Sequence, residues 1–323
     1  MQLPAQLRTA IVSKAESVNG RELAKAAEQI SKRYRSEDFK SPIMRTDAER
    51  AAYALTRMPA TYAASRHVFE QIRGAVPETQ IESVLDIGAG AGSASWAAVE
   101  VFPSIQRISM VERDAAFAAM AREFAAKAGS EALRNATHLC ADMRTNPPSA
   151  ADLVILSYAL GELTREDAAR VIAQALQAAK KLLVVVEPGT MRGFGTILAV
   201  REFLLGAHQQ LVAPCPHHNV CPMAAAGDWC HVAQRIERTA EHRRLKGADL
   251  GYEDEKFSYV AAAKFEFRRP SSRIVRHPLI RPGHIQLTLC TPDGLKLETI
   301  GKSQKEKFRA ARAAYWGAPW MHP

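Results

Sequence analysis

The sequence contains no long apolar run. Its longest runs, such as residues 182–186, are far too short to cross a bilayer, so we expect no membrane-spanning segment. Residues 1–30 also lack the apolar core of a secretory signal, and they carry Glu16 and Glu22, whereas transit peptides are poor in acids. Internal repeats and low-complexity segments are absent. These absences predict a mature cytoplasmic chain of bacterial type.

Acidic residues are fewer than basic ones. The 43 Lys and Arg exceed the 34 Asp and Glu, which gives a formal net charge of +9. Clustered cations neutralise phosphates and release counterions, so nucleic acid or another polyanion is one expected partner. A basic enzyme without such a partner is the alternative. The excess is concentrated between Arg268 and Arg312, where acids are scarce.

The five cysteines are unevenly distributed. Cys215, Cys221 and Cys230 fall in one short segment and Cys290 lies further on. Without a secretory signature, such grouping indicates a metal site more than disulfides. Five and eight residues separate the first three, which is wider than the usual pairs of structural zinc and suits an iron–sulfur cluster. Spacing alone leaves zinc and a cluster open. Cys140, in an apolar segment, is expected to pack in the core.

Three regions of different pattern divide the chain. Residues 1–80 are Ala-rich with helical spacing, and a helix is expected to begin at Asp47. Residues 81–205 alternate strand-like segments with Ala-rich helices, the rhythm of a parallel, doubly wound sheet. The expected strands span 83–88, 107–112, 137–142, 152–158 and 181–187. This pattern predicts an α/β, Rossmann-like core.

Residues 206–323 break that rhythm. They contain the cysteine segment, a strand-like run at 257–265, a hairpin around Pro292–Gly294 and a basic helix after Ser303. We expect this region to be a cysteine-rich, metal-binding insertion that also supplies the remaining core strands. Its end is expected to form a basic extension of β structure and helix.

A glycine turn follows the first expected strand. Gly88, Gly90 and Gly92 come after Asp86, in a spacing that favours a nucleoside with an amino-acid tail over a pyrophosphate. Glu112 ends the second expected strand, where a carboxylate can bind both ribose hydroxyls. Asp142 ends the third and can contact an adenine amino group. Together these features resemble the motifs of class I S-adenosylmethionine methyltransferases.

No catalytic motif follows the fourth expected strand. Residues 146–149 read Asn-Pro-Pro-Ser, like the catalytic loop of amino-group methyltransferases, but they precede that strand and predict a turn. Pro214–Cys215 resembles a pyrimidine methyltransferase nucleophile, yet it follows the fifth strand. Ser157, Tyr158 and Glu162 are therefore the pocket candidates, and Glu162 becomes a base only if burial raises its pKa.

Six segments resemble, in order, the mitochondrial small-ribosomal-subunit methyltransferase-like family and its bacterial relatives. They are VLDIGAGAGSASWAA, SYALGEL, VEPGTMRGF, APCPHHNVCPM with DWCH, YEDEKFSYV and RPGHIQLTLCTPDG. The resemblance implies a class I methyltransferase fold that binds S-adenosylmethionine. It also implies a [4Fe-4S] cluster on Cys215, Cys221, Cys230 and Cys290, and association with the RNA of the small ribosomal subunit during assembly.

Basic residues are the expected RNA contacts. They are Arg235, Arg238, Arg243, Arg244, Lys246, Arg268, Arg269, Arg273, Arg276, Arg281, Lys302, Lys305 and Lys307. Trp316 and Trp320 either stack on bases or, as the favoured alternative, pack against the C-terminal helix.

Three functions remain as hypotheses. The first is a methyltransferase that acts on small-subunit ribosomal RNA. The second is a non-catalytic iron–sulfur assembly factor that binds the same RNA, and the third is a zinc-stapled methyltransferase for a small molecule or protein. We expect a monomer when free, located in the cytoplasm if bacterial and in mitochondria if eukaryotic.

Overall fold

The computed structural model describes residues 1–36, 44–145, 149–246 and 249–321. The chain divides into two compact units, each built from stretches that are distant in the sequence. Unit 1 contains Met1–Phe69, Gln80–Lys180 and Gln234–Glu255, whereas unit 2 contains Glu70–Thr79, Lys181–Ala233 and Lys256–Pro323. Within the described ranges, no helix is both long and apolar enough to span a bilayer.

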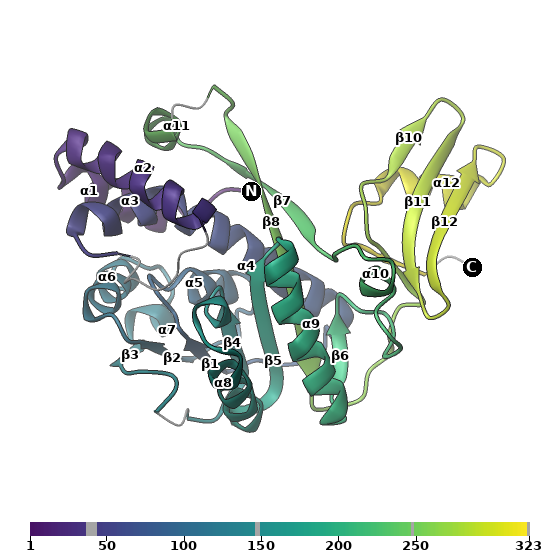
Figure 1. The fold of residues 1–323 in the computed structure, drawn as a ribbon, viewed down its shortest axis with the longest axis horizontal. Helices are drawn as coiled ribbons and strands as arrows, with labels where there is room; N and C mark the ends of the chain where they lie inside the picture. The colour runs from purple at the N-terminus through teal and green to yellow at the C-terminus, as the bar shows by residue number, and fades with distance from the viewer. Residues whose placement is uncertain (37–43, 146–148, 247–248, 322–323) are drawn as a thin grey trace. The chain divides into compact units, whose positions relative to one another are not determined.

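Helices form the N-terminal part of unit 1. They are α1 (Ala5–Glu16), α2 (Gly20–Ser36), α3 (Asp47–Thr56) and the first part of α4 (Met58–Ala75). The predicted start of α3 is confirmed, because Thr46 and Glu49 form a reciprocal capping box at its first turn. Both α1 and α2 pack against α3 (Figure 1).

Parallel strands form the sheet of unit 1. They are β1 (Ser83–Ile87), β2 (Arg107–Glu112), β3 (Thr137–Cys140) and β4 (Ala151–Ser157), in the order β3-β2-β1-β4. The helical elements between and after them are α5 (Ser93–Val101), α6 (Ala115–Ala125), α7 (Glu131–Arg134), the 3₁₀ turn η1 (Leu160–Glu162) and α8 (Arg165–Ala178). The four strands predicted in this part of the chain are confirmed.

The prediction for Cys140 is wrong. Cys140 is exposed, and so is its neighbour Leu139. The reason is that β3 is the edge strand of unit 1, where only β2 covers it within the sheet. By contrast, every residue of β1, which has a neighbour on each side, is buried.

Antiparallel strands characterise unit 2. β8 (Tyr252–Ala263) pairs antiparallel with β5 (Ala179–Pro188) and with β6 (Gln210–Ala213). The strands predicted at 181–187 and 257–265 are confirmed, whereas β6 was not predicted. Parallel strands in unit 1 and antiparallel strands in unit 2, with helices between them in the chain, are the pattern of an α/β, Rossmann-like fold. The predicted α/β fold class is therefore confirmed.

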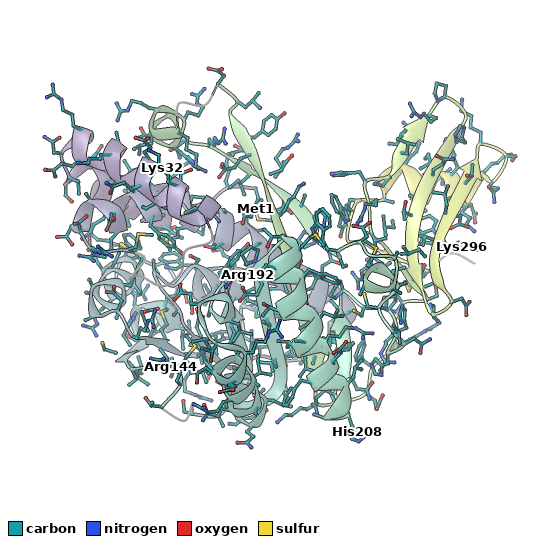
Figure 2. All side chains as sticks on the ribbon, in the orientation of Figure 1. Met1, Lys32, Arg144, Arg192, His208 and Lys296 are labelled. Atoms are coloured by element: carbon teal, nitrogen blue, oxygen red, sulfur yellow. The ribbon has the colours of Figure 1, made fainter. Side chains whose placement is uncertain are left out.

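Helix α9 (Met191–Gly206) follows β5 through a tight turn. The Thr190 hydroxyl accepts a hydrogen bond from the Gly193 N–H, and a Cβ on Gly193 would lie 2.0 Å from the Pro188 carbonyl oxygen. Figure 2 shows Arg192 near the start of α9 and His208 just beyond its end. Close backbone packing therefore requires glycine at position 193, the second glycine of VEPGTMRGF.

Unit 2 also contains a second sheet, near the C-terminus of the chain (Figure 1). It contains β9 (Ser272–Ile274), β10 (Leu279–Arg281), β11 (His284–Thr291), β12 (Gly294–Gly301) and β13 (Pro319–Trp320), with α12 (Lys305–Ala313) against it. The predicted hairpin is confirmed, because Thr291 pairs with Gly294 at the turn between β11 and β12. Trp320 is buried against this core and its indole N–H donates to Glu298, so it packs and does not stack on bases.

Residues 232–246, after the cysteine segment, form a strand and a short helix. β7 (Val232–Glu237) pairs with β8, and α11 (Ala240–Lys246) lies between them in the chain. Within unit 1, α11 packs against α2 and α3. The short helix α10 (Pro222–Ala225) lies in the cysteine segment itself.

Candidate cofactor site and cysteine cavity

The glycine turn after β1 has a backbone that favours glycine. Gly88, Gly90 and Gly92 have φ angles of 71°, 54° and 83°. A Cβ on Gly88 would lie 2.8 Å from Cβ of Ala159, whereas a Cβ on Gly90 would meet no atom within 4 Å. The turn is therefore tightly packed at Gly88 and open at Gly90. It leads directly into α5, whose first N–H groups have no partner inside the helix.

Asp86 lies buried at the end of β1. Its Oδ2 accepts a hydrogen bond from the Ser95 hydroxyl of α5 over 2.8 Å, whereas its buried Oδ1 has no partner among the described residues. Burial raises the pKa of this carboxyl to about 6, although the hydrogen bonds from Ser95 oppose the shift. Asp86 thus holds α5 against β1 and keeps one acceptor atom unused.

Glu112 ends β2 and contacts the glycine turn directly. Its Oε2 accepts the Gly90 N–H over 2.9 Å, and its Oε1 accepts the Asp114 N–H over 2.9 Å. Burial raises its pKa, and the two backbone donors partly offset that effect. A carboxylate oxygen has more than one acceptor position, so both oxygens can accept a further hydrogen bond.

Asp142 follows β3 and is paired with Arg144. The guanidinium Nε lies 3.0 Å from each carboxylate oxygen of Asp142, and Arg144 is labelled in Figure 2. This side-chain hydrogen bonding lowers the pKa of Asp142 to about 2. The carboxyl ends of neighbouring parallel strands meet at one edge of a sheet. Asp86, Gly90, Glu112 and Asp142 therefore share that edge in unit 1.

The three pocket candidates lie at the end of β4 or just after it, and other side chains engage all of them. The Ser157 hydroxyl lies 3.2 Å from that of Ser65, and Glu162 lies 3.2 Å from the Arg113 guanidinium. Burial raises the pKa of Glu162, as a general base at this place would require. Residues 146–148 of the Asn-Pro-Pro-Ser segment lie outside the described residues.

Tyr158 has an unusual backbone conformation for a residue with a side chain. Its φ is 58°, and its hydroxyl donates to Glu255 over 3.1 Å. Glu255 also lies 3.6 Å from the Arg57 guanidinium. The sequence did not identify Arg57, Ser65 or Glu255, which lie far from β4 in the chain. The alternating acids of YEDEKFSYV were the one available signal for Glu255.

The four clustered cysteines line one cavity in unit 2. Cys215 and Cys221 come from the loop after β6, Cys230 precedes β7, and Cys290 lies in β11. The other lining residues are mainly apolar and include Phe194, Ile197, Leu198, Met223, Val232, Val260, Ile274 and Val275. Among the described residues, however, no three His, Cys, Asp or Glu side chains are grouped as ligands of a metal ion.

The thiols of this cavity are strongly affected by burial. Burial raises the pKa of the Cys215 and Cys230 thiols and raises that of Cys290 to about 12, and the charges of neighbouring cysteines add to each shift. The guanidiniums of Arg201 and Arg273 oppose the shift at Cys215 and Cys290. The Arg201 Nε–H also donates to Cys215 Sγ over 3.4 Å. Any ligand that stabilises thiolates would therefore find cations already present.

The predicted RNA-facing residues differ in exposure and in whether an acidic side chain pairs with them. Arg243, Arg244, Arg268, Arg281, Lys302 and Lys305 are exposed. Arg238 and Lys246 pair with Glu253, Arg235 pairs with Asp254, Arg276 with Asp228 and Lys307 with Glu298. The prediction for Arg273 is wrong, because this residue is buried and hydrogen-bonds to Gln71 and the Gly317 carbonyl.

Comparison with known proteins adds a family match. A sequence model described as "Mitochondrial small ribosomal subunit Rsm22" matches residues 47–321. The human ribosome assembly protein METTL17, mitochondrial, is 28% identical over 291 residues, which cover 84% of this chain and 62% of that protein. The Rsm22-cox11 tandem protein 2, mitochondrial, of Schizosaccharomyces pombe is 27% identical, with 84% and 43% covered.

The chain thus spans less than two thirds of the length of these two relatives. Among solved structures, magnesium protoporphyrin IX methyltransferase from Synechocystis PCC 6803 with bound SAM is 11% identical. That comparison covers 72% of this chain and 90% of the other, with a TM-score of 0.40.

Proposed function

Because the chain belongs to the mitochondrial small ribosomal subunit Rsm22 family, we propose that it is an S-adenosylmethionine-dependent, methyltransferase-like protein of small-subunit assembly. Its substrate or binding partner is the RNA of that subunit. The observation that carries the proposal is the 2.9 Å hydrogen bond from the Gly90 N–H to Glu112. It joins an open glycine turn to a carboxylate at the edge where ligands of such sheets bind.

Each residue at this edge has a distinct role in the proposed site. Glu112 accepts the ribose hydroxyls with the acceptor positions that Gly90 and Asp114 leave unused. The open space at Gly90 lets the ligand approach the backbone. The Oδ1 of Asp86, which has no partner among the described residues, can accept a hydrogen bond from the ligand. Asp142 accepts a hydrogen bond from the adenine amino group, while Arg144 keeps the Asp142 carboxylate in position. S-adenosylmethionine, when bound, supplies an electrophilic methyl group.

On the substrate side, Glu162 is the candidate base. Burial raises the pKa of Glu162, which brings its protonation equilibrium closer to neutral pH, where a general base must accept and release protons. The non-catalytic assembly factor remains the second candidate function for a specific reason. All three pocket candidates already contact other side chains: Ser157 contacts Ser65, Tyr158 contacts Glu255, and Glu162 contacts Arg113.

For the cysteine cavity we propose a [4Fe-4S] cluster on Cys215, Cys221, Cys230 and Cys290. The donor set supports it: the four thiols line one cavity with an apolar wall and two arginines. A centre there would clip the loops around β6 and β7 to β11 within unit 2. Zinc is the alternative metal, and the two are separated by analysis of the purified protein.

The proposed RNA surface consists of the exposed cations named above. In a bacterium the protein would act in the cytoplasm and in a eukaryote in mitochondria, and we propose a monomer until it meets the subunit.

Transfer of labelled methyl groups to 30S RNA tests the main proposal. Wild type should bind S-adenosylmethionine and label the RNA, whereas Glu112→Gln should bind the cofactor at least tenfold more weakly, since an amide N–H would face a backbone N–H. The exposed Glu100→Gln is the matched control. Cofactor binding without labelling would support the non-catalytic factor, and no binding by wild type would refute the cofactor site.

Anaerobic purification tests the metal. Iron and acid-labile sulfide in wild type, lost in Cys230→Ser but kept in Cys140→Ser, would support the cluster. Cys140 serves as control because it is exposed and lies in unit 1. Stoichiometric zinc in place of iron would overturn the cluster.

A further inference from the structure

Several buried polar groups around the cysteine cavity lack hydrogen-bond partners. Among the described residues, Oη of Tyr259, Nε of Arg273 and Nε1 of Trp316 are buried and have none, and all three residues line the cavity. Each of these atoms carries a hydrogen that it can donate. A buried donor without an acceptor is unfavourable, because it has lost its hydrogen bond to water without gaining another. Three such donors at one cavity indicate an acceptor that is bound there.

Two buried cations lie at the same cavity. Arg201 is 5% exposed and Arg273 is 2% exposed, and both residues line it. The described lining residues include no Asp or Glu. A buried guanidinium without a negative partner is strongly unfavourable, so the cavity requires negative charge from another source.

Hydrogen bonds within the protein satisfy only some of the N–H donors of these two arginines. Nη2 of Arg201 donates to the Asn219 carbonyl over 2.6 Å, and Nη1 of Arg273 donates to Gln71 over 2.9 Å and to the Gly317 carbonyl over 2.6 Å. These contacts orient the two side chains. They leave Nε of Arg201 on Cys215 Sγ at 3.4 Å and Nε of Arg273 without an acceptor.

We infer that the cavity is built for a thiolate-ligated centre of net negative charge, with Arg201 and Arg273 as its counter-ions. Tyr259, Trp316 and the Arg273 Nε–H donate hydrogen bonds to its sulfur atoms. This assignment rests on the proposed metal site. Four thiolates carry more negative charge than a dipositive iron–sulfur core neutralises, so the two guanidiniums complement the charge that remains.

The assignment has a consequence for redox behaviour. Reduction adds an electron to an already anionic centre, and nearby positive charge and hydrogen bonds to sulfur favour that step. Removing a cation or a donor should therefore make the midpoint potential more negative. A side chain that only fills space would not change the potential in this direction.

The test uses the full-length protein purified without oxygen. The variants are Tyr259→Phe and Trp316→Phe, which keep an aromatic ring but remove the donor, and Arg201→Gln with Arg201→Lys. The controls are Tyr252→Phe and Arg192→Gln, since both residues lie away from the cavity lining and Arg192 is in the same helix as Arg201. The measurements are iron and sulfide per chain and the midpoint potential from a dye-mediated redox titration.

We expect the phenylalanine variants and Arg201→Gln to have more negative potentials than wild type, with Arg201→Lys between them and both controls unchanged. Unchanged potentials in the two phenylalanine variants, with iron retained, would overturn the inference and leave the metal site standing.

If wild type holds zinc, the readout is the rate of zinc loss to a chelator. That loss should be faster in the same variants, and equal rates would overturn the inference. A wild type without any metal would refute the metal site and the inference together.

Discussion

Asp86 is a carboxylate in an apolar environment. It lies in β1, whose residues are all buried, and Ser95 donates to its side chain. The unfolded chain exposes the same carboxyl to water, so its ordinary pKa of 3.8 rises to about 6 on folding. Below pH 3.8 the group is protonated in both states, and above pH 6 it is charged in both.

This difference predicts a pH dependence of stability. Between pH 3.8 and about 6 the folded state binds more protons, so the free energy of unfolding should fall as pH rises through this window. The contribution of Asp86 is on the order of 3 kcal/mol. Asp86→Asn cannot titrate and should make this slope smaller by the part that Asp86 contributes, which urea unfolding followed by circular dichroism at several pH values would measure.

Asp142→Asn is the matched control. Arg144 lowers the pKa of Asp142 from 3.8 to about 2, so this group is charged in the folded state throughout the window. Above about pH 5 it is charged in the unfolded state as well, and there its replacement should leave the slope unchanged. If wild type and Asp86→Asn showed equal slopes, the raised pKa of Asp86 would be wrong.

The place of a residue in the fold was predictable where the residue type and its position at a strand end agreed. Asp86, Glu112 and the glycines were identified because they stand at strand ends, where spacing alone determines the edge. Cys140 and Arg273 were not, since exposure depends on which strands lie beside them. Trp316 was expected to pack on the C-terminal helix or stack on a base, but the fold brings it to the cysteine cavity.

At the scale of elements, the turn from β5 into α9 depends on backbone contact. Within α9, Gly193 and Gly195 differ only in surroundings. A Cβ at Gly193 would lie 2.0 Å from the Pro188 carbonyl oxygen, whereas one at Gly195 would meet nothing within 4 Å.

Alanine at these two glycines should therefore have opposite effects. Gly193→Ala must displace the turn and should destabilise the protein by more than about 3 kcal/mol, or prevent folding. Gly195→Ala should stabilise it by roughly 0.5–1 kcal/mol through better helix propensity. Thermal unfolding of both variants measures the difference. Equal midpoints would contradict the tight turn.

Elements with strong periodicity were the predictable ones. The strands of the core and the β11–β12 hairpin combine apolar segments with clear turn signals. β6 and β7 were missed for different reasons. β6 has only four residues, and β7 contains Gln234, Arg235 and Glu237 among its six. Pairing with β8 makes both of them strands, and the β6–β8 pairing joins residues about fifty positions apart in the chain.

At the scale of the whole molecule, the charge excess bears on the proposed binding of RNA. Salt bridges inside each unit engage several of the basic residues, so fewer than the 43 Lys and Arg are available to contact phosphates. Lys302 and Lys305 are exposed and belong to the basic C-terminal segment.

Neutralising these two lysines should weaken RNA binding in a salt-dependent manner. Each lost phosphate contact should reduce the slope of log K against log salt by about one, so Lys302→Gln with Lys305→Gln should reduce it by about two. Filter binding to small-subunit RNA at several salt concentrations measures it. The exposed pair Arg107→Gln and Lys127→Gln, outside the proposed surface, should leave the slope unchanged. An equal loss in both pairs would indicate nonspecific attraction.

The sequence by itself determined the fold class, the glycine turn and the resemblance that the family match confirms. These depend on short-range order along the chain: strand periodicity, residues at strand ends and motifs read in sequence. Only the tertiary structure decided which cations are exposed and which line the cysteine cavity. It also brought Glu255 to Tyr158, and it left three buried donors of the cavity-lining residues without acceptors among the described residues. Those properties depend on contacts between residues that are distant in the chain, and burial and charge compensation arise from such contacts.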